Sequence, residues 1–248
     1  MLQVTILGCG ASTGVPMIGC DCSVCSSDSN YNKRTRSAIY INDEHSQILV
    51  DFGYDIKYQL VREKIKTLDA AVLTHNHSDH VNGIEDLRIF YFIQKKPLGI
   101  YTDRATATIL HERFDYLFSS NFLATKPFDF FDKVKIKTIE IQFFKQNHGA
   151  IDSLGLRIGD FVYSPDVNDF PPESEKFLKD INIWIIDCMD YTSNANHAGL
   201  DKVLEWNAIY KPKQILLTNM RHTIDYHKIT EILPPNIKPL YDGYKFTV

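Results

Sequence analysis

Two hydrophobic patterns alternate along this 248-residue chain. Short apolar runs that are rich in β-branched residues and bounded by polar residues predict buried strands. These runs lie at residues 4–7, 38–41, 47–51, 70–73, 98–101, 134–137, 139–144, 154–158, 161–164, 181–186 and 214–217, with a closing strand or turn at 241–246. Apolar residues spaced three or four apart predict helices at 54–66, 79–94, 103–117, 173–178 and 200–210. Because no repeat or linker interrupts this alternation, we predict a single domain over residues 1–248.

The segment with the strongest chemical signal directly follows a buried strand and reads THNHSDH, residues 74–80. In an extended segment alternate side chains share a face, so His75, His77 and Asp79 can converge, while His80 begins the next helix with Ser78 as its N-cap. Four ligands are too many for one ion that keeps an open position. We therefore predict two divalent ions, the first on His75 and His77 and the second on Asp79 and His80. Such ligands suit zinc, manganese or iron.

Two further candidate ligands lie at the ends of predicted strands, and a third residue of interest lies in a loop. His148 ends a strand and is placed to join the first ion. Asp166 also ends a strand, and a carboxylate there is suited to bridge two cations. His197 lies in a polar loop before the helix at 200–210, which is a position where an ordinary surface histidine is expected.

A second candidate metal site is the C-x-C-x2-C segment formed by Cys20, Cys22 and Cys25. Three thiolates can wrap one tetrahedral ion and need a fourth ligand from elsewhere, which predicts one structural zinc. The alternative is three free cysteines in a polar loop. Cys9 and Cys188 look like small core residues, and an odd total of five cysteines does not suit a disulfide framework.

Three other segments allow two interpretations each. The glycine-rich loop at 8–16 is either a structural turn or a loop lining the site. Arg34 and Arg36 lie in a basic turn that we expect to be solvated, although a guanidinium can also hold phosphate. The aromatic-rich segment 114–131 is expected to pack in the core or against a second copy as a homodimer, or else to cover the site.

Composition narrows the function classes. Hydrophobic residues make up 44% and charged residues 23% of the chain, as in ordinary globular proteins. The net charge of −4 argues against a general nucleic-acid-binding protein. No apolar run approaches the roughly 20 residues of a membrane span, and the first residues lack the basic start of a signal peptide. We expect a cytoplasmic protein with no membrane partner.

These residues together resemble the metallo-β-lactamase fold superfamily. The resemblance rests on the candidate ligands of segment 74–80, followed by His148 and Asp166. The resemblance implies an α/β, four-layer αββα sandwich with a binuclear metal site at the edge of its sheets. The branch that is most similar is that of the phosphoribosyl 1,2-cyclic phosphate phosphodiesterases, which share the glycine-rich opening and the three cysteines. It implies a structural zinc on the cysteines and a late histidine, and a catalytic role for His197.

One position departs from that branch, which has Thr-His-x-x-His near its end. Here Asn219 stands at the first histidine position and His222 at the second. Either His222 completes the cysteine zinc and the second catalytic ion lacks one ligand, or His222 serves the catalytic pair. A weakened second position would favour manganese or hold its ion loosely.

The resulting functional expectation is a metal-dependent hydrolase, a phosphodiesterase acting on a small cyclic or nucleotide-like phosphodiester. A hydroxide activated by the binuclear zinc or manganese centre would attack phosphorus, Asp79 would orient it, and His197 would protonate the leaving oxygen. Two alternatives remain open: a non-enzymatic or cofactor-pathway accessory protein with a weakened second metal site, and a transfer-RNA 3′-end endonuclease.

Overall fold

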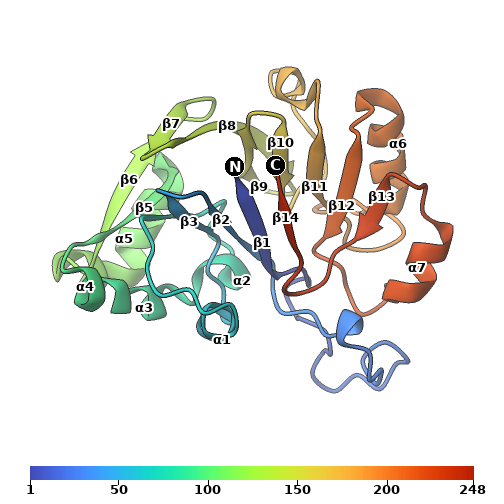
Figure 1. Cartoon of the computed structure of the whole chain (residues 1–248), viewed down its shortest axis with the longest axis horizontal. Coiled ribbons are helices and arrows are strands. Elements are labelled where there is room, and N and C mark those ends of the chain that lie inside the picture. The colour runs from blue at the N-terminus through green and yellow to red at the C-terminus, as the bar shows by residue number, and fades with distance from the viewer.

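A computed structural model describes residues 1–248 and shows two β-sheets packed face to face between outer helices (Figure 1). Each sheet has seven strands and mixes parallel with antiparallel pairs. The αββα sandwich expected from the sequence is confirmed. None of the helices combines the length and apolar character that a membrane crossing requires.

The first sheet has the strand order β14-β1-β2-β3-β4-β5-β6. Its strands are β1 (Gln3–Gly8), β2 (Ala38–Asn42), β3 (Gln47–Val50), β4 (Ala70–Val72), β5 (Leu98–Asp103), β6 (Leu123–Phe128) and β14 (Lys245–Thr247). The strands β3 to β6 run parallel, whereas β1, β2 and β14 pair antiparallel. Because β14 pairs with β1, the two ends of the chain lie side by side (Figure 1).

The second sheet has the order β13-β12-β11-β10-β9-β8-β7. Its strands are β7 (Lys133–Ile136), β8 (Ile139–His148), β9 (Ile151–Ile158), β10 (Phe161–Ser164), β11 (Ile183–Asp187), β12 (Gln214–Thr218) and β13 (Ile237–Pro239). The four strands β10 to β13 run parallel. Each sheet therefore brings the carboxyl ends of several strands to one edge, which is where α/β folds place ligand sites.

Helices cover the outer face of each sheet (Figure 1). Those beside the first sheet are α1 (Ile56–Arg62), α2 (Ser78–Val81), α3 (Ile84–Leu87), α4 (Ile89–Gln94) and α5 (Arg104–Ser119). Those beside the second are α6 (Leu200–Tyr210) and α7 (Tyr226–Ile232). Two short 3₁₀ turns, at Asn30–Asn32 and Glu175–Leu178, complete the secondary structure.

The main hydrophobic core contains 41 buried residues and joins the facing surfaces of both sheets to α6. A smaller core of 18 buried residues lies between the first sheet and the helices α1 to α5. Cys9 and Cys188 are fully buried, as expected for small core residues. Phe128 belongs to the main core and Phe114 packs against the smaller one, so the aromatic-rich segment 114–131 contributes to core packing.

Several elements differ from their sequence-based predictions. The hydrophobic pattern missed β6, β13 and α7. The strand β6 reads LATKPF and lies at a sheet edge, where polar residues and a proline are tolerated, so its pattern is weak. The predicted helix 79–94 is wrong, because the structure divides it into α2, α3 and α4. The N-cap of α2 is His77 and not Ser78.

Gly83 explains the first break in that helix. Its backbone leaves the helical conformation at ψ 7°, and its N–H donates to the carbonyl of Phe52 at 2.9 Å. A Cβ atom there would lie 2.1 Å from the carbonyl oxygen of Gly53 and 2.4 Å from a methyl group of Ile56. The glycine thus lets the metal-motif segment pack against the chain that follows β3.

We expect Gly83→Ala to lower the free energy of unfolding by about 1–3 kcal/mol, because the added methyl group overpacks this contact. Urea denaturation followed by circular dichroism measures the change. The control is Glu85→Ala, an exposed position on α3, which should change stability by less than about 0.5 kcal/mol. An alanine at position 83 that is as well tolerated as the control would contradict the proposed packing constraint.

Candidate metal centre

Four side chains from three strand ends converge at the edge of the two sheets. His75 and His77 follow β4, His148 ends β8 and Asp166 follows β10, and their potential ligand atoms all lie within 4.8 Å of one another. The Nε2 atom of His148 lies 3.1 Å from Nδ1 of His77 and 3.5 Å from a carboxylate oxygen of Asp166. The sequence therefore predicted this convergence from strand ends that are far apart in the chain.

The buried Nε2 atom of His75 provides a test of whether this group fits a metal. It has no hydrogen-bond partner in the protein, although burial of an unpartnered polar atom is costly. Burial, reinforced by the neighbouring His80, lowers the pKa of His75 well below its usual range, which favours the neutral form that coordinates metals. These properties fit a divalent cation bound by imidazole and carboxylate groups.

A second group adjoins the first and consists of Asp79, His80 and Asp166. The Nε2 atom of His80 lies 3.1 Å from Oδ1 of Asp166 and 3.4 Å from a carboxylate oxygen of Asp79. Asp166 faces His75 and His148 with its other oxygen, Oδ2. One carboxylate thus contacts both groups, which is the arrangement expected of a bridge between two ions.

Asp51 orients the second group, and the sequence analysis gave it no functional role. It lies directly after β3, is fully buried and accepts a hydrogen bond from Nδ1 of His80 at 2.7 Å. The backbone N–H and the hydroxyl of Thr74 also donate to it. A carboxylate in this position fixes the tautomer and direction of a metal-binding imidazole. The signal that could have found it is an acidic residue at a strand end.

The charges of the centre favour cation binding. Burial alone would raise the pKa of Asp166, but His80 and the other nearby imidazoles hold it well below its usual range. Burial would likewise lower the pKa of His80, yet Asp166, Asp51 and Asp79 raise it well above its usual range. Asp166 therefore stays ionised and favours a positive charge nearby, which divalent ions would supply when bound by these residues.

His197 lies beside this centre in the loop after β11. Its Nδ1–H donates to the buried carboxylate of Asp187 at 2.8 Å, and its ring centroid is 4.7 Å from that of His148. Although burial opposes it, the Asp187 carboxylate raises the pKa of His197 to about 9. The same loop fixes His148, whose Nδ1–H donates to the carbonyl of Asn196 at 2.7 Å. His197 is thus held in place and is not a mobile surface histidine.

Asn219 lies at the end of β12 and is buried in the centre. Its amide nitrogen donates to Oδ1 of Asp166, and its amide oxygen accepts a hydrogen bond from the Ser37 hydroxyl. The residue that departs from the resembling branch therefore directly contacts Asp166, the carboxylate that both groups share.

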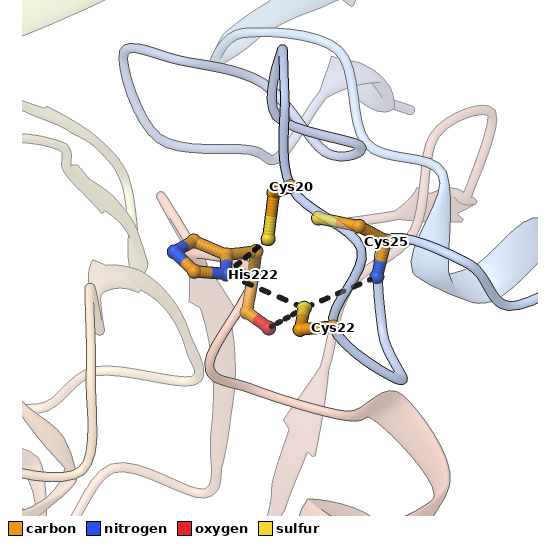
Figure 2. A group of neighbouring side chains, drawn as sticks. All are labelled: Cys20, Cys22, Cys25 and His222. Atoms are coloured by element: carbon orange, nitrogen blue, oxygen red, sulfur yellow. Dashed lines mark hydrogen bonds between the residues drawn. The ribbon is translucent and has the colours of Figure 1, made fainter.

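His222 lies among the three cysteines (Figure 2) and belongs to neither group of the histidine and aspartate cluster. Its Nδ1 atom is 3.5 Å from the sulfur of Cys20 and 3.5 Å from the sulfur of Cys22. The backbone N–H of Cys25, with a smaller contribution from His222, lowers the pKa of Cys22 to about 6 and so favours the metal-binding thiolate. The four side chains match a tetrahedral zinc site of three cysteines and one histidine.

The two arginines of the basic turn bind protein groups. Arg34 is buried, contrary to the expected solvated turn, and its guanidinium donates to the carbonyls of Arg221 and Ile224 at 2.9 and 2.7 Å. Arg36 pairs with Asp55 at 3.0 Å. Arg34 therefore ties the basic turn to the segment that carries His222, which is a structural role.

A family model described as the beta-lactamase superfamily domain matches residues 46–220, more than half of the chain. The chain belongs to this superfamily. The matched region contains the whole histidine and aspartate cluster, while the three cysteines precede it and His222 follows it. The structure shares 27% sequence identity and a TM-score of 0.95 with the crystal structure of a diphosphatase from the PhnP family, covering 100% of this chain and 98% of that one.

Other proteins that are similar to this chain carry different names. An octanoyltransferase of Porphyromonas gingivalis is 31% identical over 251 residues, which cover 98% of this chain and 51% of that protein. The chain thus spans about half the length of that relative. A ribonuclease Z of Clostridium kluyveri is 27% identical over 89 residues, 35% of this chain and 24% of that protein. Zinc-bound PqqB from Methylobacterium extorquens shares the fold, with a TM-score of 0.85 at 16% identity over 99% of this chain and 100% of that one.

We expect His222→Ala to lower the zinc content by one ion per chain, because the cysteine site loses its only nitrogen donor. Elemental analysis of the purified protein measures this loss. The control is His227→Ala, a nearby histidine whose ring contacts Ser29 and Tyr31 and none of the cysteines. Retention of that ion together with loss of a metal from the histidine and aspartate cluster would show that His222 serves the other site.

Proposed function

We propose that this superfamily member hydrolyses small phosphodiesters, including cyclic or nucleotide-like ones, with a pair of divalent metal ions. The observation that carries the proposal is His197, which Asp187 holds beside a cluster of metal-binding side chains. The structural similarity to a diphosphatase supports a hydrolytic reaction at phosphorus. A small-molecule substrate agrees with the net charge of −4, which does not favour a long polyanion.

The residues that would hold the two ions form the two groups described above. His75, His77 and His148 would hold the first, Asp79 and His80 the second, and Asp166 would bridge them. Such ions, zinc or manganese, lower the pKa of a bound water and polarise phosphoryl oxygens. A structural zinc on Cys20, Cys22, Cys25 and His222 would complete the metal content.

His197 is suited to act as the general acid. Because its Nδ1–H is committed to Asp187, its other ring nitrogen, Nε2, is the atom that can deliver a proton to the leaving oxygen. Asp187 in turn accepts the backbone N–H of Val167 at 3.1 Å, which fixes the carboxylate that positions the imidazole. Asp79 is the more exposed carboxylate of the cluster, so it is available both to bind an ion and to orient the attacking nucleophile.

Two other functions stay open as alternatives. The sequence similarity to a ribonuclease Z favours an endonuclease acting on transfer-RNA 3′ ends. The sequence similarity to a coenzyme PQQ synthesis protein B favours a non-enzymatic or cofactor-pathway accessory protein. A precursor transfer RNA offered as substrate tests the first alternative. An absence of any metal-dependent hydrolysis, in protein that contains only the cysteine-bound zinc, would favour the second.

The proposed acid is tested with two diesters that differ in their leaving group. Bis(p-nitrophenyl) phosphate releases a stabilised phenolate, whereas a ribonucleoside cyclic phosphate must release an alkoxide that needs a proton. For His197→Ala we expect kcat on the cyclic diester to fall about a hundredfold or more, and a much smaller loss on the activated diester. A chelator should abolish both activities, and zinc or manganese should restore them.

The matched control is His111→Ala, an exposed histidine whose Nε2 atom contacts only the hydroxyl of Thr125. It should leave kcat on both diesters unchanged. Equal losses on the two diesters in His197→Ala would contradict the role as general acid. No hydrolysis of either diester by the metal-loaded protein would contradict the proposed function itself.

A further inference from the structure

The two proposed ion positions have different sets of donor atoms. The first offers three imidazoles and one carboxylate oxygen, whereas the second offers one imidazole, from His80, and oxygens of Asp79 and Asp166. Imidazole donors suit zinc, while carboxylate and carbonyl oxygens suit manganese and magnesium. Any further oxygen donor at the second position would therefore increase its preference for manganese.

Asn219 adjoins the second position. Its amide nitrogen donates to Oδ1 of Asp166, the same oxygen that lies 3.1 Å from Nε2 of His80. Asn219 is only 2% exposed and adopts the left-handed conformation at φ 59°, which asparagine tolerates better than most residues. The end of β12 thus directs a neutral amide at the bridging carboxylate.

The Ser37 hydroxyl permits this amide to face either way. Its oxygen contacts the amide oxygen of Asn219, and it also lies 3.2 Å from the carbonyl oxygen of Gly10. A hydroxyl has one proton and two acceptor lone pairs, so it cannot donate to both oxygens at once. If the amide turns over, Ser37 accepts from the amide nitrogen and donates to Gly10 instead. The amide oxygen then faces the second position.

The charge at the second position decides between these orientations. Without a cation, an amide oxygen facing the ionised Asp166 would be repelled, and the amide nitrogen is the favourable neighbour. With a divalent ion bound to Asp166, the attraction reverses, because the ion draws oxygen and repels an N–H group. The amide therefore has a reason to turn when an ion enters.

We propose that Asn219 is an oxygen ligand of the second metal position and shifts the preference of that position toward Mn²⁺, relative to a histidine at the same place. This inference rests on the metal centre of the proposed function but not on the reaction assigned to it. The donor set becomes the oxygens of Asp79, Asp166 and Asn219 with one nitrogen of His80, which Asp51 already orients.

The test is a titration of Mn²⁺ into full-length, zinc-containing protein from which weakly bound metal has been dialysed. Free Mn²⁺ is followed by its electron paramagnetic resonance signal, and zinc is counted by elemental analysis. For the wild type we expect one Mn²⁺ bound per chain at the second position. For Asn219→Gly, which permits the same backbone conformation, the dissociation constant should rise about 10- to 100-fold. For Asn219→His the position should retain zinc and exclude Mn²⁺.

Asn219→Asp separates a ligand from a mere hydrogen-bond donor. A ligand oxygen with added negative charge should keep Mn²⁺ binding as tight as in the wild type or tighter. If Asn219 only donates to Asp166, the aspartate variant repels that carboxylate and binds Mn²⁺ as weakly as Asn219→Gly, which would overturn the proposal. Wild-type binding by Asn219→Gly would overturn it too.

The matched control is Thr218→Val, which alters the preceding buried residue and removes a hydroxyl near Ser37 without touching Asp166. It should leave Mn²⁺ affinity unchanged. Circular dichroism and retention of the cysteine-bound zinc show whether each variant is folded. If Asn219→Gly is not folded, the result for Asn219→Asp alone decides the test. The titration contains no substrate, so its result does not depend on whether the protein hydrolyses phosphodiesters.

Discussion

The carboxylate of Asp166 is the constraint on which the centre depends. It is buried, with one oxygen facing His75 and His148 and the other facing His80 and Asn219. A buried charge is tolerated only when it is paired and hydrogen-bonded. Here the groups available for pairing are imidazoles, which neutralise it fully only if they are protonated. Bound divalent ions would neutralise the carboxylate without protonated imidazoles. Because burial of the Asp166 charge is costly without metal, that burial favours metal binding.

The fold delivers this carboxylate and its neighbours through strand ends. Asp51 and Asn219 directly follow a strand, and Asp166 lies two residues after one. Each of the three adopts a left-handed backbone conformation with φ between 43° and 63°. Asparagine and aspartate tolerate this conformation better than other non-glycine residues. It ends the strand abruptly and turns the short polar side chain toward the site. Aspartate and asparagine therefore suit these positions for two reasons: their side chains can face a metal site, and their backbones tolerate the left-handed conformation.

The sequence predicted that most of these side chains would converge, because it reveals both the candidate ligand residues and the ends of the predicted strands. The motif His75-x-His77-x-Asp79-His80 and the strand ends at His148 and Asp166 are brought together by the structure. The supporting carboxylates were harder to recognise, because Asp51 lies about 25 residues before the motif and nothing local shows that it faces His80. The broken helix after Asp79 was missed for a similar reason. A single glycine, Gly83, is tolerated inside many helices, and only its close contact with Gly53 requires the break.

The segment after β12 connects the two candidate metal sites. Asn219 contacts the bridging carboxylate, and His222, three residues later, lies among the cysteines. The backbone between them is fixed on both sides, since Met220 donates to the carbonyl of Cys9 and Arg34 holds the carbonyl of Arg221. A zinc bound by the cysteines and His222 would anchor this segment and so hold the amide of Asn219 against Asp166. The cysteine site would then support the second ion position. Although the three cysteines and His222 lie outside the histidine and aspartate cluster, they would help to determine the geometry of that position.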